Sequence, residues 1–278
     1  MRRFKHLDSL LIGATAAVLG SATFVRPDAD SPAPTVTAKA AAIVSAKTGT
    51  FVTAEAAGAL APKSEKTGVA AEVETAMSRL AGSVRQQSHP RALETAVKSY
   101  FAYKAAHPDE VRKPYLYFVD YGLASTTPRG YVFDMEQLAV IDGPFTVAHG
   151  RGSGPRSGVP TRFANVPGAA TTSLGLYLAQ ETYGFSGHAS GVLYRSIGLR
   201  LKGLSGEFND RARERGVVAH GAPYVTRSGS GRSEGCPAME QSRAQRLLPK
   251  LANGALVFLF APNEKWLSSD PWLTAAQG

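Results

Sequence analysis

The sequence predicts a mainly β protein with flanking helices, and three observations carry this prediction. Helical periodicity is confined to residues 69–80, residues 90–106 and the residues after Cys236. The remaining stretches of regular pattern are short, rich in β-branched and aromatic residues, and separated by turn-forming residues. A chain of 278 residues with 44% apolar residues can bury a substantial core. We therefore expect a curved β sandwich or partial barrel with helices at its edges.

Residues 1–22 have the features of a signal peptide. A basic start, MRRFKHLDS, precedes an apolar run of about sixteen residues, and a Gly-Ser-Ala step ends at Ala22. We expect export to the periplasm or cell envelope, with cleavage near Ala22. Retention of residues 1–25 as an anchor is the alternative, because the run approaches the length that spans a bilayer.

Residues 23–68 are dominated by Ala, Pro, Thr, Ser and Lys and show no sustained periodicity. This composition predicts a low-complexity linker between the export signal and the folded part of the chain.

The chain is basic, with a net charge of +9 from 31 basic and 22 acidic residues. Cleavage after Ala22 removes three basic residues and one acidic residue, which leaves +7. This charge suits attraction to an anionic polymer such as the cell wall, and equally to anionic lipid or nucleic acid. Export and the lack of a basic-aromatic array argue against nucleic acid.

Residues 69–108 are expected to form a helical N-terminal extension. It contains a helix over 69–80 and a second over 90–106, with Ser88 or His89 near the cap of the second. We interpret the apolar positions of the second helix as packing against the rest of the fold; they are Leu93, Ala96, Val97, Tyr100, Phe101 and Tyr103.

Residues 109–278 are expected to form the main domain. Three consecutive strands are predicted first, followed by three that are further apart, and their ranges are 115–121, 130–136, 138–150, 200–204, 217–220 and 255–260.

Cys236 is the only cysteine of the chain, and it lies sixteen residues after His220. His220 ends a short apolar strand, and the residues between them are rich in Gly and Ser, so we expect an irregular loop that folds the cysteine back onto the histidine. Pro237 suits the first position of a helix. Cys236 would then be the helix N-cap, where the helix dipole favours the thiolate.

Neighbouring charges would act on the same thiol. An imidazolium at His220 and the side chain of Arg232 would favour the thiolate, whereas an inward-pointing Glu234 would oppose it. From the spacing alone, two interpretations stay open: a cysteine nucleophile with its base, or a buried cysteine with a satisfied histidine. A single thiol in an exported protein, with no disulfide partner, favours the first.

Other candidate residues carry weaker signals. His149, before the glycine-rich run 150–158, either lines the site or has a structural role, and His188 is expected in an exposed loop. A metal site at these histidines and His220 is not expected, because none of the local metal-ligand spacings is present. Arg151 and Arg156 contact either a substrate carboxylate or water.

Several motifs in order resemble one family: VAHGRGSG, FANVPGAATTSLGLY, GLSGEFNDRARERGVVAHGAPYV and GRSEGCPA. The chain is similar over roughly residues 90–262 to the murein L,D-transpeptidases, in their YkuD-like type 2 subfamily. The resemblance implies the mainly β YkuD-like fold and an enzyme that needs no cofactor. The partners that it implies are peptidoglycan stem peptides; it leaves the oligomeric state open.

The resemblance implies a reaction in which Cys236 attacks the bond between the L-centre of a diamino acid and D-alanine. A thioester forms and passes to an amine, as a 3-3 cross-link or D-amino acid exchange. His220 would be the base, with the carbonyl of Gly221 holding its ring. Backbone N–H groups of Gly235 and Cys236 would receive the oxyanion, and Ser233 would order the loop or touch the substrate.

Two alternatives to transpeptidation remain: an L,D-carboxypeptidase that hydrolyses the same bond, and a non-catalytic wall-binding protein. The sequence also departs from the family pattern at Pro237, Ala238 and Glu234, so recognition of the substrate carboxylate must come from elsewhere. Arg232 is the first candidate for it; His149, Tyr224 and Glu234 are the further candidates for substrate contact.

Overall fold

A computed structural model describes residues 68–274 of the chain. The predicted signal peptide, and all of the predicted linker except Gly68, lie outside the described residues. Within residues 68–274, no helix is both long and apolar enough to cross a membrane.

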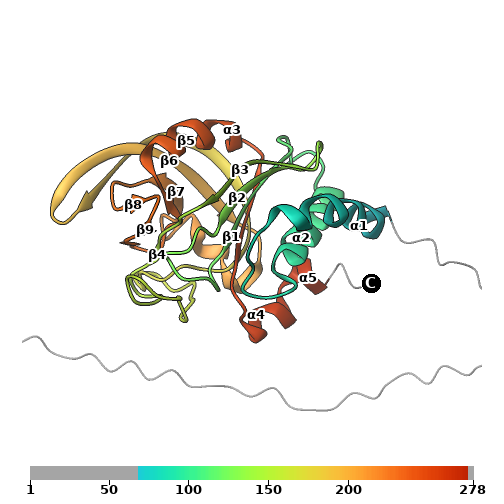
Figure 1. Ribbon diagram of the computed structural model, residues 1–278, viewed down its shortest axis with the longest axis horizontal. Helices are drawn as coiled ribbons and strands as arrows, with labels where there is room; N and C mark the ends of the chain where they lie inside the picture. The colour runs from blue at the N-terminus through green and yellow to red at the C-terminus, as the bar shows by residue number, and fades with distance from the viewer. Residues whose placement is uncertain (1–67, 275–278) are drawn as a thin grey trace, which may run out of the picture. The chain divides into compact units, whose positions relative to one another are not determined.

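An eight-stranded sheet dominates the structure, in the order β11-β7-β6-β5-β12-β1-β2-β3 (Figure 1). The sheet is open, with β11 and β3 at its edges. The expected mainly β fold with flanking helices is therefore confirmed, whereas the sheet does not close into a barrel. Its strands are β1 (Tyr115–Asp120), β2 (Gly130–Asp134), β3 (Ala139–Phe145), β5 (Gly175–Ala189), β6 (Val192–Gly203), β7 (Val218–Gly221), β11 (Ala238–Met239) and β12 (Leu256–Phe260).

The core lies around the central parallel pair of β1 and β12, in which Leu116 pairs with Leu256. Every residue of β12 is buried, and so is every residue of β1 after Tyr115. Strands buried on both faces read as continuous apolar runs, such as LVFLF, rather than as an alternating pattern. This explains why the positions of these two strands could be predicted from the sequence.

The helices occur near where the periodicity predicts them. The expected packing of the aromatic residues of α2 is confirmed: Tyr100, Phe101 and Tyr103 are buried, and Tyr103 meets Trp272 edge to face at 4.8 Å between ring centroids. The α-helices are α1 (Gly68–Leu80), α2 (Ala92–Ala106), α3 (Gln241–Leu251), α4 (Glu264–Ser269) and α5 (Pro271–Thr274). Single 3-10 turns occur at η1 (Ala81–Ser83), η2 (Gly206–Phe208) and η3 (Asp210–Ala212).

A long hairpin of β5 and β6 was not predicted in full. The expected strand over 200–204 is only the end of β6, and the expected loop around His188 is part of the hairpin, in which His188 pairs with Leu193. The hairpin projects away from α1 and α2 (Figure 1). Its tip is rich in Gly, Ser and Ala, a composition typical of loops, so backbone pairing overrides local preference there.

The helix expected directly after Cys236 begins later. Residues Ala238–Met239 form β11, Glu240 is the N-cap, and α3 begins at Gln241. The predicted buried positions of this helix are confirmed at Ala244, Leu247, Leu248 and Leu251. The N-cap position predicted for Cys236 is therefore wrong, because pairing of β11 with β7 keeps the chain extended after the cysteine.

Candidate active site

The segment that carries Cys236 is held by strand pairing on both sides. Before the cysteine, β10 (Arg232–Ser233) runs parallel to β4 (His149–Gly150). After it, β11 runs parallel to β7, with Ala238 paired with His220. The expected irregular loop between His220 and Cys236 also contains two further short strands, β8 (Val225–Thr226) and β9 (Gly229–Ser230). The thiol therefore sits in a turn whose two ends are fixed.

Ser233 orders this turn through its hydroxyl. The Oγ of Ser233 donates to the carbonyl of Cys236 at 2.7 Å and accepts from the N–H of Gly235 at 3.1 Å. These two contacts are consistent with the first of the two roles expected for Ser233, ordering of the loop. The same contact engages the Gly235 N–H, which was expected to receive an oxyanion, so in this structure that N–H is not free for the role.

Two glycines allow the chain to pass close to the turn. A Cβ on Gly150 would lie 2.9 Å from the Cα of Gly235, and one on Gly235 would lie 2.8 Å from the carbonyl oxygen of Thr171. Gly235 also has a φ of 128°, which favours glycine. A side chain at Gly150 in β4 or at Gly235 in the turn would therefore clash with neighbouring backbone.

His220 is almost fully buried in β7, where its Nδ1 lies 3.1 Å from the carbonyl oxygen of Gly221. This contact is the one expected for Gly221. Because a carbonyl only accepts, the proton is assigned to Nδ1, which leaves the Nε2 lone pair free to accept a proton. The ring of Phe185, from the long hairpin, stacks on the imidazole with centroids 4.2 Å apart and an interplanar angle of 21°. Phe185 was not predicted, because its position follows from the hairpin.

Cys236 lies in the turn just before β11, and His220 lies in β7, the strand that pairs with β11, but their side chains are not joined. The residue paired with His220 is Ala238, two positions after the cysteine. The Cys236 sulfur lies 3.8 Å from the carbonyl oxygen of Gly216, and within residues 68–274 it makes no hydrogen bond to the imidazole. Contacts between a nucleophile and its base are often loose in free enzymes. In the proposed reaction the two side chains come into contact before they exchange a proton.

Burial shifts both pKa values toward the uncharged forms. The pKa of the Cys236 thiol is raised by burial and, more weakly, by the charge of Glu234, while a backbone hydrogen bond from Val218 and the charge of Arg215 oppose the shift. Burial lowers the pKa of His220 to about 4, although the Gly221 carbonyl opposes this. At neutral pH the pair is thus a thiol and a neutral imidazole, rather than the thiolate and imidazolium considered from the sequence.

Arg215 is the cation that acts on the thiol, and sequence reasoning missed it. Its half-buried guanidinium donates from Nη2 to the Thr171 carbonyl at 2.8 Å and from Nη1 to the Ser173 hydroxyl at 3.2 Å. Within the described part of the chain, no carboxylate pairs with it. The sequence contains no signal for this role, because Arg215 lies twenty-one positions before Cys236 and is brought near by the pairing of β7 with β11.

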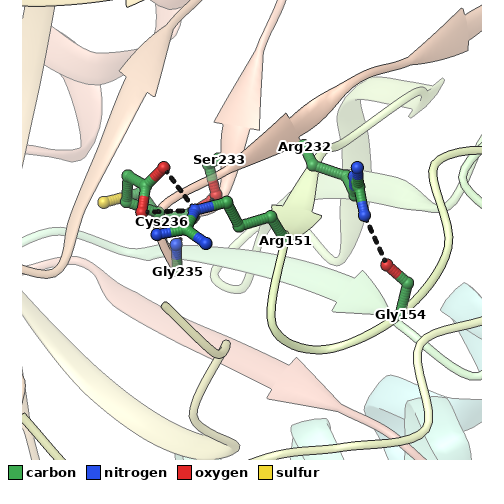
Figure 2. Close-up of polar contacts among 7 residues, drawn as sticks. Arg151, Gly154, Arg232, Ser233, Gly235 and Cys236 are labelled. Carbon is green, nitrogen blue, oxygen red and sulfur yellow. Dashed lines mark hydrogen bonds and ion pairs between the residues drawn. The ribbon is translucent and has the colours of Figure 1, made fainter. Parts of the chain in front are cut away.

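Arg232 does not assist the thiol as expected. Its Nη1 lies 3.4 Å from the carbonyl oxygen of Gly154, and its side chain points away from Cys236 (Figure 2). Glu234 points outward, where both of its oxygens accept from the Arg151 Nε at 2.7 and 2.8 Å. An exposed pair of this kind contributes little to stability.

The two remaining candidates differ in accessibility. His149 is fully buried, accepts from Arg129 Nη2 at 3.0 Å through Nδ1, and has its pKa lowered to about 4 by burial and by the Arg129 charge. It therefore does not line the open site. Tyr224 is half-buried beside Tyr194, with ring centroids 6.3 Å apart, and lines a cavity together with Arg232.

Among residues 68–274, no three His, Cys, Asp or Glu side chains are grouped so that they could hold a metal ion.

Comparisons with known proteins point to one family. The family model described as L,D-transpeptidase catalytic domain matches residues 84–260. No curated protein matches the sequence.

Solved structures show only distant similarity. An L,D-transpeptidase from Mycobacterium smegmatis has 14% sequence identity and a TM-score of 0.33, with 53% of this chain and 59% of that chain covered. An L,D-transpeptidase from Stackebrandtia nassauensis has 16% identity and a TM-score of 0.33, with 68% and 75% covered. One from Xylanimonas cellulosilytica has 13% identity and a TM-score of 0.32, with 53% and 61% covered. The chain thus spans about three-fifths of the M. smegmatis and X. cellulosilytica structures.

Replacing Arg215 with Gln is expected to slow alkylation of Cys236 by iodoacetamide about three- to tenfold at pH 7.5. Loss of a nearby positive charge raises the pKa of the thiol further, and a shift of about one unit changes the thiolate fraction about tenfold. Arg215→Lys, which keeps the charge, should react nearly as fast as the wild type. Arg211→Gln, at an exposed arginine that pairs with Glu214, is the matched control. Equal rates for Arg215→Gln and the wild type would contradict this assignment.

Proposed function

The chain belongs to the L,D-transpeptidase catalytic domain family, and on this premise we propose that it remodels peptidoglycan with Cys236 as its nucleophile. The proposed donor is a tetrapeptide stem, and the bond attacked joins the L-centre of its third residue, a diamino acid, to the terminal D-alanine. The proposed acceptor is an amine, which gives a 3-3 cross-link or an exchanged D-amino acid.

One observation carries this proposal. Two strand pairings fix the ends of the turn with the single cysteine, and one of them places that turn against the strand that holds His220. A buried imidazole whose Nδ1 is engaged by a backbone carbonyl presents Nε2 as a base. A partly buried thiol in a turn held against the strand of such a base supports nucleophilic catalysis by cysteine.

In the proposed first step, the thiol proton moves to His220 Nε2 as the Cys236 sulfur attacks the carbonyl carbon. Collapse of the tetrahedral intermediate breaks the C–N bond, and the protonated imidazole gives its proton to the departing D-alanine amine. The product on the protein is a thioester. An acceptor amine then attacks the thioester, His220 takes its proton, and the same proton returns to the sulfur.

The oxyanion of each tetrahedral intermediate requires donors. The backbone N–H of Cys236 is our proposed donor, since the Gly235 N–H is held by Ser233 and Pro237 has none. Such a donor contributes about 2.7–4 kcal/mol to transition-state stabilisation in known hydrolases. The charge of Arg215 supports the developing thiolate and offsets part of the cost of burial.

Two alternatives follow from specific features. Water in place of the amine would make the protein an L,D-carboxypeptidase, and Cys236 is only partly buried, which is compatible with either acceptor. The absence of a hydrogen bond between Cys236 and His220 in the described structure favours the second alternative, a wall-binding protein without turnover.

We also propose that the chain acts outside the cytoplasmic membrane. The basic and apolar start of residues 1–22 supports export, and the net positive charge suits an anionic wall. Whether the leader is removed can be measured directly from the N-terminal sequence of the protein recovered from cells.

The proposal is tested with the purified full chain and a disaccharide tetrapeptide. The wild type should release D-alanine, and Cys236→Ala should lose at least about 1,000-fold in rate, because the nucleophile is gone. A cross-linked dimer would indicate transpeptidation, and a tripeptide would indicate hydrolysis. Matching thermal unfolding curves for both proteins would exclude misfolding. Binding without release of D-alanine by the wild type would instead support a wall-binding role.

The pH dependence tests the neutral imidazole. Because the pKa of His220 is lowered to about 4, the base is unprotonated above this value, so kcat/KM should fall only below about pH 5. His149 also has a lowered pKa, so the effect of its titration must be separated from that of His220. The variant His149→Asn keeps an acceptor near Arg129 and should show the same fall in kcat/KM at low pH as the wild type. His220→Asn should abolish activity. An acid limb centred near 6.5, the ordinary imidazole value, would contradict the account.

A further inference from the structure

A basic cavity of about 220 Å³ lies beside β10, the strand that leads into the cysteine turn. Three arginines line it, together with a histidine from the hairpin, a tyrosine and a glycine: Arg151, Arg156, Arg232, His188, Tyr224 and Gly231. A cavity of this volume is smaller than the roughly 300–1,000 Å³ of drug-sized ligand pockets. It has room for a group of about the size of one amino-acid residue.

The cavity has an excess of positive charge. Within residues 68–274, Arg151 pairs with Glu234, whereas Arg156 and Arg232 have no carboxylate partner. Neighbouring like charges repel one another, and a bound anion removes that repulsion. The two unpaired guanidinium groups therefore favour an anionic ligand.

Arg232 and Arg151 lie on backbone that is held by hydrogen bonds between strands. Arg232 belongs to β10, which pairs with β4, and the N–H of Arg151 donates to the carbonyl of Ser233 at 2.7 Å. The Arg232 guanidinium is itself held against the carbonyl of Gly154 (Figure 2). The contact with Gly154 limits the entropy that the Arg232 side chain loses when a ligand binds.

Residues that line the cavity also interact with the cysteine turn. Glu234, whose charge acts on the Cys236 thiol, is the residue that holds Arg151 at the edge of the cavity. Tyr224 lines the cavity and also interacts electrostatically with Cys236. In Figure 2, Arg151 lies between Cys236 and Arg232. These interactions link the lining of the cavity to the turn that carries the thiol.

We infer that this cavity is a subsite for a free carboxylate of the stem peptide that Cys236 attacks, with Arg156 and Arg232 as its donors. The inference rests on the proposed function, because it takes the ligand from the same substrate. A planar guanidinium donates two parallel hydrogen bonds to a carboxylate. Tyr224 lines the same cavity and supplies an aromatic wall next to the arginines.

A carboxylate of the stem fits the cavity better than a phosphate of a wall polymer. The cavity is small and lies beside β10, the strand that leads into the cysteine turn, so we take its ligand to be part of the molecule that reaches Cys236. The proposed substrate carries carboxylates within one or two residues of the bond that is broken. A phosphate polymer has no group for the thiol to attack.

The test is a double-mutant cycle between arginines of the protein and carboxylates of the peptide. In the full chain carrying Cys236→Ala, dissociation constants are measured by calorimetry for the tetrapeptide and for forms with one carboxylate amidated. Arg156→Gln and Arg232→Gln should each weaken binding of the free tetrapeptide about tenfold, since each removes a charge-assisted hydrogen bond. With one of the amidated peptides, this effect should disappear.

Matched controls separate recognition from folding and from general charge. Arg79→Gln, at an exposed arginine of α1, removes the same charge outside the cavity and should leave every dissociation constant unchanged. Arg232→Lys should recover part of the affinity. The inference is overturned if the arginine variants weaken all peptides by the same factor, or if they weaken binding of glycerol phosphate alone.

The outcome is separable from that of the proposed function. Release of D-alanine by the wild type without coupling between arginine and carboxylate would overturn the subsite and leave the enzyme in place. Coupling without release of D-alanine would support the subsite on a protein that binds stem peptides but does not process them.

Discussion

Parallel pairing of β11 with β7 is the constraint on which the candidate site depends. It keeps the chain extended after Cys236, delays the start of α3 to Gln241, and sets the cysteine turn against the strand of His220. The matching pair of β10 and β4 fixes the other end of the turn. The same framework positions Arg232 over the basic cavity, so the turn links two regions of distinct chemistry.

Burial by this framework decides the protonation state of the pair. A thiol with a raised pKa and an imidazole with a pKa of about 4 are both uncharged at neutral pH. Catalysis would then couple proton transfer to attack on the carbonyl, instead of using a preformed thiolate. Arg215 has no carboxylate partner within the described structure, and its charge lowers the free-energy cost of forming the Cys236 thiolate.

The sequence was sufficient for the elements that local pattern determines. The apolar runs predicted the positions of β1 and β12, and helical periodicity predicted α2 and the buried face of α3. The motifs around His220 and Cys236 pointed to the family. Features that depend on long-range pairing could not be predicted. They include the extent of the β5–β6 hairpin, the stacking of Phe185 on His220, the position of Arg215, and the extended backbone after Cys236. Local preference for a helix at Pro237 was outweighed by hydrogen bonds to a strand distant in sequence.

The measurement that tests the central claim most directly is the location of the acyl group during turnover. The full chain is mixed with tetrapeptide, quenched in acid within seconds, digested, and mapped by mass spectrometry. The account predicts a tripeptide-acyl group on the peptide that contains Cys236, removable by hydroxylamine as a thioester should be. An acyl group on another residue, or product formation by the Cys236→Ala protein at the wild-type rate, would contradict it.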